Sequence, residues 1–157
     1  MFNLIDDYMK KLPYILIGVI AMLLVFCAVC LADTIGKKNN NPLNLKAFDN
    51  WQGMTGQDKF GHCIFESLEM GIRAGLINLK THTKKHPDET LVHYLMTFAE
   101  QNGAFEAAFV ADRLGISIET KLKDINLVDF FIALARFESK MDLDKQEVIR
   151  IKERWGI

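Results

Sequence analysis

One uncharged segment constrains the fold of this chain more than any other feature. From Leu12 to Ala32 there are 21 consecutive residues without a charged side chain, and a helix of about 20 such residues spans the hydrocarbon core of a bilayer. The alternative, a core helix that is apolar on every face, is unusual in a chain of 157 residues. The run predicts a single membrane-spanning helix and argues against a multi-span protein or a free cytosolic protein.

A cleaved signal peptide is a second alternative for this segment. The two lysines before the run are offset by two aspartates, and the run is longer than the apolar region of about 7–15 residues in a typical signal peptide. No clear small-x-small cleavage site follows it. We therefore interpret residues 1–11 as a flank and residues 12–32 as an uncleaved signal anchor. Lysines at both ends nearly balance the positive-inside rule, so the charges leave the orientation open.

The rest of the chain has the size and composition of one globular domain. Residues 33–157 carry 18 acidic and 17 basic side chains, a balance that provides no basic surface for nucleic acid. Residues 33–42 are polar and turn-rich and are predicted to be a linker, which leaves residues 43–157 for the domain. Cys63 is the only cysteine after the apolar run, so packing must stabilise the domain without an internal disulfide.

Apolar periodicity predicts that this domain is mainly helical. Two short apolar pieces within residues 43–65, separated by glycines, indicate a small hairpin or an irregular loop. The spacing of apolar residues then predicts five helices, of which the fourth is the most apolar and the expected centre of the core. They begin near Ser67, Thr90, Asn102, Asn126 and Asp144.

Two glutamates at the start of the first domain helix are the main candidates for chemistry. Glu66 and Glu69 have apolar neighbours such as Trp51 and Phe65, and apolar surroundings raise the pKa of a carboxyl into the range of a general acid for glycoside cleavage. The alternative is structural, because acidic residues in the first turn interact favourably with the helix dipole.

Four other carboxylates are secondary candidates. Asp49 and Asp58 lie in the predicted hairpin region and can supply a second carboxylate or orient water. Glu106 and Glu138 lie on later helices, and Glu138 ends the most apolar one. That position predicts either a desolvated carboxylate or a structural partner for a nearby arginine.

Patterns for metal, cofactor or nucleophile chemistry are weak. His82 and His86 are four residues apart, but no glutamate lies between them and two lysines would repel a cation. The neighbouring His62 and Cys63 would point to opposite faces of a strand, and Cys63 is interpreted as a small buried apolar residue. We find no G-x-S-x-G motif and no phosphate loop, so we expect no metal and no cofactor.

Two motifs resemble a family of small phage and prophage proteins described as virion structural proteins. The first runs from Asn39 to Lys46 and is followed by the tripeptide at 51–53; the second runs from Cys63 to Ala74, after Phe60. The pattern of that family is N-N-P-x-N-[IL]-[RK], W-x-G and F-x-S-x-x-x-G-x-R-A. The resemblance covers about residues 37–140.

This family looks related to lysozyme-like proteins and to phage lysins that open peptidoglycan. The asparagine-rich segment is similar to the N-N-x-x-G-[IL]-K segment of bacterial glucosaminidases, which there follows the catalytic helix, whereas here the apolar run and the linker precede it. The resemblance implies a lysozyme-like domain outside the cytoplasm, anchored in a bacterial inner membrane or a virion membrane, that acts on peptidoglycan. Glu69 would be its general acid, with Glu66 in reserve.

The same hypothesis implies roles for five other residues. Asn41, Asn44 and Trp51 would line the glycan groove, although asparagines beside a proline also suit turns. Phe65 would be structural, and Arg73 would pair with a buried carboxylate or with backbone carbonyls, because a lone buried charge is costly. The alternative function is a non-catalytic structural or glycan-binding module of a virion or membrane, with virion or membrane proteins as possible partners.

Overall fold

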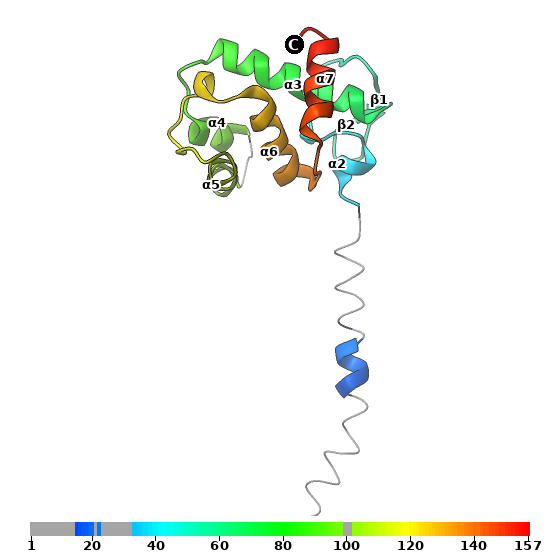
Figure 1. Ribbon diagram of the computed structural model, residues 1–157. Helices are drawn as coiled ribbons and strands as arrows, with labels where there is room; N and C mark the ends of the chain where they lie inside the picture. Colours follow the sequence, from blue (N-terminus) through cyan, green and yellow to red (C-terminus); the bar gives the residue numbers. More distant parts are fainter. Residues whose placement is uncertain (1–14, 21, 23–32, 99–101) are drawn as a thin grey trace, which may run out of the picture. The chain divides into compact units, whose positions relative to one another are not determined.

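A computed structural model describes residues 15–20, 22, 33–98 and 102–157 (Figure 1). The chain divides into two compact units, Met1–Asp33 and Thr34–Ile157. In the first unit the described residues 15–20 and 22 are helical. Most of the predicted anchor 12–32 lies outside the described residues, and within those that are described no helix is both long and apolar enough to span a bilayer.

The second unit is mainly helical and carries one small hairpin, as predicted (Figure 1). Its elements, in chain order, are α2 (Ile35–Lys38), β1 (Met54–Gln57), β2 (Cys63–Phe65), α3 (Leu68–Lys85), α4 (Leu91–Phe98), α5 (Gly103–Leu114), the 3₁₀ turn η1 (Leu122–Asp124), α6 (Leu127–Ser139) and α7 (Lys145–Arg154). The predicted linker 33–42 belongs to this unit from Thr34 onwards.

Local capping sets the helix boundaries, as the sequence predicts. The side chains of Ser67, Asn126 and Asp144 accept hydrogen bonds from backbone N–H groups in the first turns of α3, α6 and α7. Such caps satisfy N–H groups that have no partner within the helix. Gly115 ends α5 in the left-handed conformation, with φ of 64°, where a glycine has no Cβ to clash.

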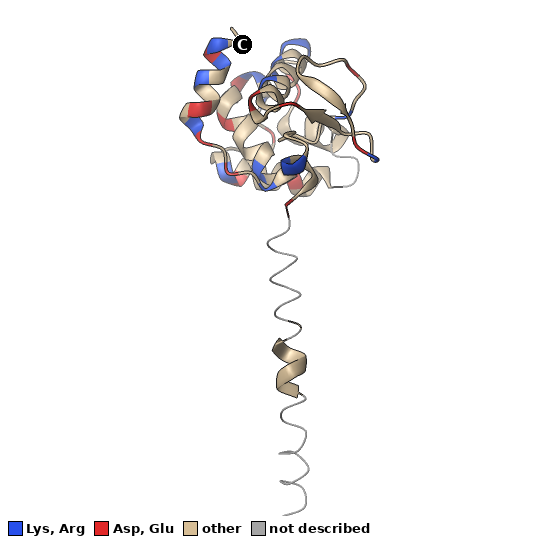
Figure 2. Cartoon of the chain, turned by 90° about the vertical axis from the view of Figure 1, so that its right-hand side faces the viewer, with Lys and Arg blue, Asp and Glu red and all other residues tan. Residues whose placement is uncertain are grey.

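Helix α6 is the centre of the core. It contacts α2, α3, α5 and α7, and Phe130, Phe131 and Leu134 on it are buried. Burying an aromatic or leucine side chain contributes about 1.5–3 kcal/mol, so this helix supplies much of the driving force for folding. At the surface, acidic and basic residues are interspersed, for example along α7 (Figure 2).

The hairpin is held against an asparagine-rich loop that precedes it. Strands β1 and β2 pair antiparallel, with an irregularity between Met54 and Gly56. On its other side, β2 donates from the N–H of Cys63 to the carbonyl of Leu45 and from the N–H of Phe65 to the carbonyl of Asn39. Residues 39–45, which we call the Asn loop, therefore lie alongside β2 and extend the hairpin.

Candidate active site

A cavity of about 800 Å³ is lined by the Asn loop, by the segment that follows this loop, and by helices α3 to α6. Cavities of this size are typical of ligand sites. Its lining combines aromatic, acidic and amide side chains. The residues are Leu43, Asn44, Leu45, Lys46, Phe48, Asp49, Trp51, His62, Asn78, His82, Tyr94, Thr97, Phe98, Asn102, Glu106, Phe137 and Glu138.

Glu106 is the most unusual residue of this lining. It lies in the first turn of α5 and is fully buried, with an exposed fraction of 0%. Neither of its carboxyl oxygens has a hydrogen-bond partner within the described part of the chain. Burial first, and then the negative charge of Glu138, raise the pKa of Glu106 to about 8. Glu106 therefore retains its proton at neutral pH.

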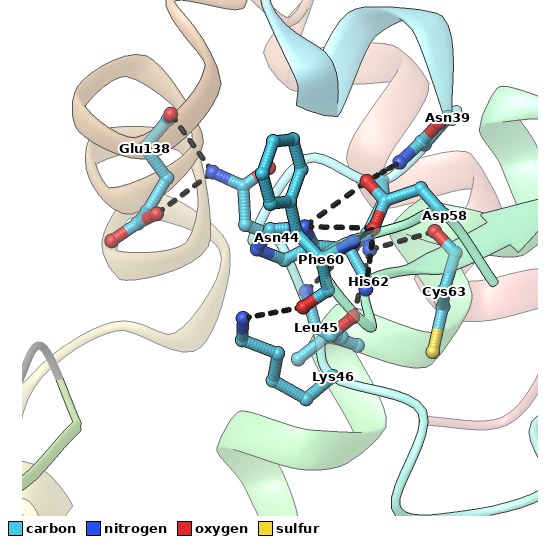
Figure 3. Close-up of polar contacts among 10 residues, drawn as sticks. Asn39, Asn44, Leu45, Lys46, Asp58, Phe60, His62, Cys63 and Glu138 are labelled. Carbon is cyan, nitrogen blue, oxygen red and sulfur yellow. Dashed lines mark hydrogen bonds and ion pairs between the residues drawn. The ribbon is translucent and has the colours of Figure 1, made fainter.

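Glu138 is the second carboxyl of the cavity, and it is half-buried. It lies in the last turn of α6, where its Oε2 accepts a hydrogen bond of 2.9 Å from Nδ2 of Asn44. The same Nδ2 donates to the backbone carbonyl of Glu138 at 3.0 Å. Figure 3 shows both bonds converging on the Asn44 amide. Asn44, a predicted groove residue, lines this cavity, and its amide is hydrogen-bonded to Glu138.

The other asparagine of the predicted groove lies inside the protein. Asn41 is fully buried, donates from Nδ2 to the carbonyls of Leu45 and Cys63, and accepts from the N–H of Leu45. Its side chain closes the Asn loop and holds this loop against β2. The asparagine-rich motif thus builds the wall of the cavity, and only Asn44 of this predicted pair lines it.

Aromatic side chains form much of the remaining wall. Trp51, for which a place in the glycan groove was predicted, lines the cavity together with Phe48, Phe98 and Phe137. Flat apolar rings of this kind present large contact areas to a ligand. Phe65, predicted to be structural, is buried in the core with an exposed fraction of 2%.

The two aspartates of the hairpin region differ in position. Asp49 lines the cavity. Asp58 instead closes the turn between β1 and β2, where it accepts from the N–H groups of Phe60 and His62 and from the amide of Asn39 (Figure 3). Burial alone would raise the pKa of Asp58, but these hydrogen bonds outweigh it and hold the pKa well below its usual range.

Glu66 and Glu69, the predicted catalytic pair, are not among the residues that line the cavity. Glu69 accepts from the indole N–H of Trp155 at 3.1 Å and from Nη1 of Arg154 at 2.8 Å. These bonds lower the pKa of Glu69, whereas a general acid must hold a proton near its working pH. Glu66 is exposed at the end of the hairpin. The structure does not bring these two residues together with Asn44 and Trp51.

Arg73 has a different partner from the one predicted. Its guanidinium stacks on the indole of Trp155, with 4.7 Å from Cζ to the ring centroid, which is a cation–π geometry. Its buried Nε has no hydrogen-bond partner within the described ranges. Arg73 and Glu69 therefore meet at Trp155 and attach the C-terminal end of α7 to α3.

The sequence also indicates that Glu106, a secondary candidate, lies on a buried helix face. The buried residues of α5 include Gly103, Ala107, Val110 and Ala111, and their helical spacing places Glu106 on the same face. A carboxyl on an apolar face is expected to have a raised pKa. The contact between Glu138 and Asn44 had no such signal, because 94 positions separate the two residues.

The described part of the chain offers no metal centre. The comparisons with known proteins supply no family. Among the described residues, no group of three or more His, Cys, Asp and Glu side chains is arranged to hold a metal ion. His82, which lines the cavity, pairs with the carboxylate of Glu89. Compared with protein-family models and with curated protein sequences, the chain matches none of either. The function must therefore be inferred from the geometry of the site.

Proposed function

We propose that residues 34–157 form a lysozyme-like domain that cleaves the glycan strands of peptidoglycan, with Glu106 and Glu138 as its acid–base pair. One observation carries the proposal. A buried carboxyl that keeps its proton at neutral pH lies near a second carboxyl, in the lining of an aromatic cavity. Carboxyls whose environments separate their pKa values are the usual acid–base equipment of glycosidases.

The pair can supply both proton steps of the reaction. The proton that the pair retains passes to the glycosidic oxygen, and the bond from this oxygen to C1 then breaks. The ionised carboxylate stabilises the positive charge that develops at C1. Water, or a hydroxyl of the same sugar, next bonds to C1 and returns a proton to the pair. The first course is hydrolysis and the second is that of a lytic transglycosylase.

The position of α6 supports the proposal. The resemblance implies that a catalytic helix lies before the asparagine-rich segment, where this chain has its apolar run. Helix α6 comes from near the opposite end of the chain, yet in the structure it ends against that segment. Nδ2 of Asn44 donates to Oε2 of Glu138, and Oγ of Ser139 donates to the carbonyl of Pro42 at 2.9 Å. The acid in the last turn of α6 is Glu138.

The uncharged run is the basis for the proposed location of the domain. As an uncleaved anchor in a bacterial inner membrane or a virion membrane, residues 12–32 would keep the domain close to the cell wall. The proposal thus describes a muralytic protein of phage or prophage origin, with the domain outside the cytoplasm and with membrane and peptidoglycan as its partners.

Release of soluble fragments from purified peptidoglycan tests the activity. We expect the full-length chain in detergent to release them, and Glu106→Gln and Glu138→Gln each to reduce the rate by about 100-fold or more. Glu69→Gln is the matched control and should stay within about twofold of the wild type, because Glu69 is not part of the cavity lining. Mass spectrometry of the fragments separates hydrolysis from transglycosylation by the anhydro ring of the latter.

Two outcomes would contradict this assignment. Full activity of Glu138→Gln would remove the carboxyl pair from the mechanism. Loss of activity in Glu69→Gln, with the other two variants active, would return the acid role to Glu69.

A second candidate is a glycan-binding module without catalysis. The complete burial of Glu106 and the aromatic lining favour it, because rings bind sugars without any proton transfer. In this case the wild type would sediment with intact peptidoglycan but release nothing, and Trp51→Ala would weaken the sedimentation while Glu138→Gln would not.

A further inference from the structure

We propose that Asn44 is a positioning residue that fixes the side chain of Glu138 by donating a hydrogen bond to its Oε2. This inference rests on the proposed function, because it assigns Glu138 to the reacting pair. It begins from the two hydrogen bonds that Nδ2 of Asn44 donates, at 2.9 Å to Oε2 and at 3.0 Å to the backbone carbonyl of Glu138.

The geometry fixes which end of the Asn44 amide faces Glu138. A backbone carbonyl can only accept a hydrogen bond, so the atom that contacts the carbonyl of Glu138 must be the amide nitrogen. That nitrogen has two hydrogens, and the two bonds to Glu138 use both. The donor at Oε2 therefore needs an acceptor there, and an ionised carboxylate oxygen is the stronger acceptor.

The consequence concerns the proton of the carboxyl pair. With Oε2 of Glu138 held as an acceptor, the proton of the pair stays on Glu106, whose pKa is raised to about 8. Asn44 thereby orients the pair, and its amide hydrogens are not available to a substrate.

Asn44 itself is rigidly placed. Its backbone is left-handed, with φ of 49°, a conformation that asparagine tolerates better than most residues. Its N–H donates to the carbonyl of Asn41, and its Oδ1 lies 2.9 Å from the position that a Cβ on Gly36 would occupy. The backbone of Asn44 is thus fixed and its amide nitrogen is held by Glu138, whereas its buried Oδ1 has no hydrogen-bond partner among the described residues.

The end of α6 is held equally firmly by residues next to Glu138. Ser139 is buried and donates from Oγ to the carbonyl of Pro42, and its own carbonyl accepts from Oγ of Thr34 at 2.6 Å. These bonds attach the last turn of α6 to the segment 34–44. The hydrogen bond from Asn44 to the carboxylate is thus made between two fixed partners, as positioning requires.

Asn44→Asp tests the inference, because it keeps the size and the backbone preference, removes the donor and adds a negative charge. Asn50→Asp is the control for the added charge, because Asn50 is exposed and is not among the residues that line the cavity. We would titrate the full-length chain, labelled with ¹³C at the glutamate carboxyls and held in detergent micelles. The same variants would be assayed on peptidoglycan across the pH range.

We expect Asn44→Asp to raise the titration midpoints of the carboxyl pair by about one pH unit or more, because the ionised form loses a donor and gains a like charge. We expect kcat to fall by about tenfold or more, with KM within about twofold. Asn50→Asp should change neither. A fall in activity alone, with unshifted midpoints, would assign Asn44 a merely structural role.

A second variant keeps the test decisive if Asn44→Asp fails to fold. Asn44→Gly accepts the left-handed backbone without strain and removes the donor without adding a charge, so we expect a smaller shift in the same direction. Unshifted midpoints in the folded variants of Asn44, or an equal shift in Asn50→Asp, would overturn the inference. Because the titration needs no turnover, shifted midpoints in an inactive wild type would refute the proposed function and leave the positioning intact.

Discussion

Glu106 and Glu69 both lie in the first turn of a helix, yet their surroundings differ in every respect that sets a pKa. Glu69 is half-exposed and accepts hydrogen bonds from Trp155 and Arg154, which lower its pKa. Glu106 is buried close to the charge of Glu138, and its pKa is raised to about 8. At the scale of the residue, the same type of side chain is therefore an ionised structural group at Glu69 and a protonated carboxyl at Glu106.

The raised pKa of Glu106 predicts how stability depends on pH. Between the ordinary pKa of 4.5 and about 8, the folded state binds a proton at Glu106 that the unfolded state has released. The contribution of Glu106 to the free energy of unfolding is therefore present below pH 4.5 and is lost as the pH rises through this window. Glu106→Gln should remove this loss. The difference in the free energy of unfolding between the variant and the wild type should therefore rise by about 1 kcal/mol or more, in favour of the variant, from pH 5 to pH 8.

Denaturant unfolding at pH 5 and pH 8 measures this difference. Glu66→Gln is a suitable control because Glu66 is exposed, and it should leave the pH dependence of the wild type unchanged. If the wild type and Glu106→Gln show the same pH dependence, then Glu106 is ionised in the folded protein at neutral pH.

At the scale of the elements, glycines allow the Asn loop and α6 to approach α3 closely. A Cβ on Gly71 of α3 would lie 1.7 Å from the carbonyl oxygen of Asn40. A Cβ on Gly75, one turn later, would lie 2.5 Å from the ring of Phe131 on α6. The G-x-R-A motif thus begins with a glycine whose missing side chain makes room for the Asn loop.

Gly71→Ala should therefore destabilise the domain by about 3 kcal/mol, because the obstacle is backbone that cannot move aside. We also expect it to displace the Asn loop and to reduce activity. Gly56→Ala is the control, since a Cβ there meets nothing within 4 Å, and it should change stability by less than about 0.5 kcal/mol. Thermal unfolding of the two variants checks the difference, and equal melting temperatures would contradict the close approach.

At the scale of the whole molecule, each end of the helical unit is attached to a helix that is distant in sequence. Thr34, its first residue, binds the carbonyl of Ser139 at the end of α6. Near the other end, Trp155 carries the guanidinium of Arg73 and donates to Glu69 on α3. The unit is therefore closed by the attachment of its first segment to α6 and of its last segment to α3, and the site lies beside the first of these contacts.

This closure predicts where the domain can be cut. Residues 34–157 should fold cooperatively with a melting temperature close to that of the same domain in the full-length chain. Residues 43–157, which begin at the predicted domain boundary, lack α2 and the buried Asn41, and they should melt at least about 10 °C lower or without a cooperative transition. Circular dichroism during heating compares the two, and equal stability would restore residues 33–42 to the status of a linker.

The helices and the hairpin could be predicted because their causes are local. Ser67, Asn126 and Asp144 cap the helices that they were expected to begin, and Gly115 ends α5. Apolar residues at helical spacing placed α6 at the centre of the core. The segment 33–42 shows the limit of local patterns. Its polar residues are typical of a linker, but their hydrogen bonds are to distant residues such as Asp58 and Phe65.

The sequence by itself determined a mainly helical unit with a small hairpin, the caps of its helices and the helix at its centre, because each depends on residues a few positions apart. Only the tertiary structure decided the site. It brought Glu106 and Glu138 into one cavity, buried the first and held the second by Asn44. A pKa depends on solvent, charges and donors that arrive from other parts of the chain. Candidate acids can therefore be found in a sequence, but their protonation is set by the fold.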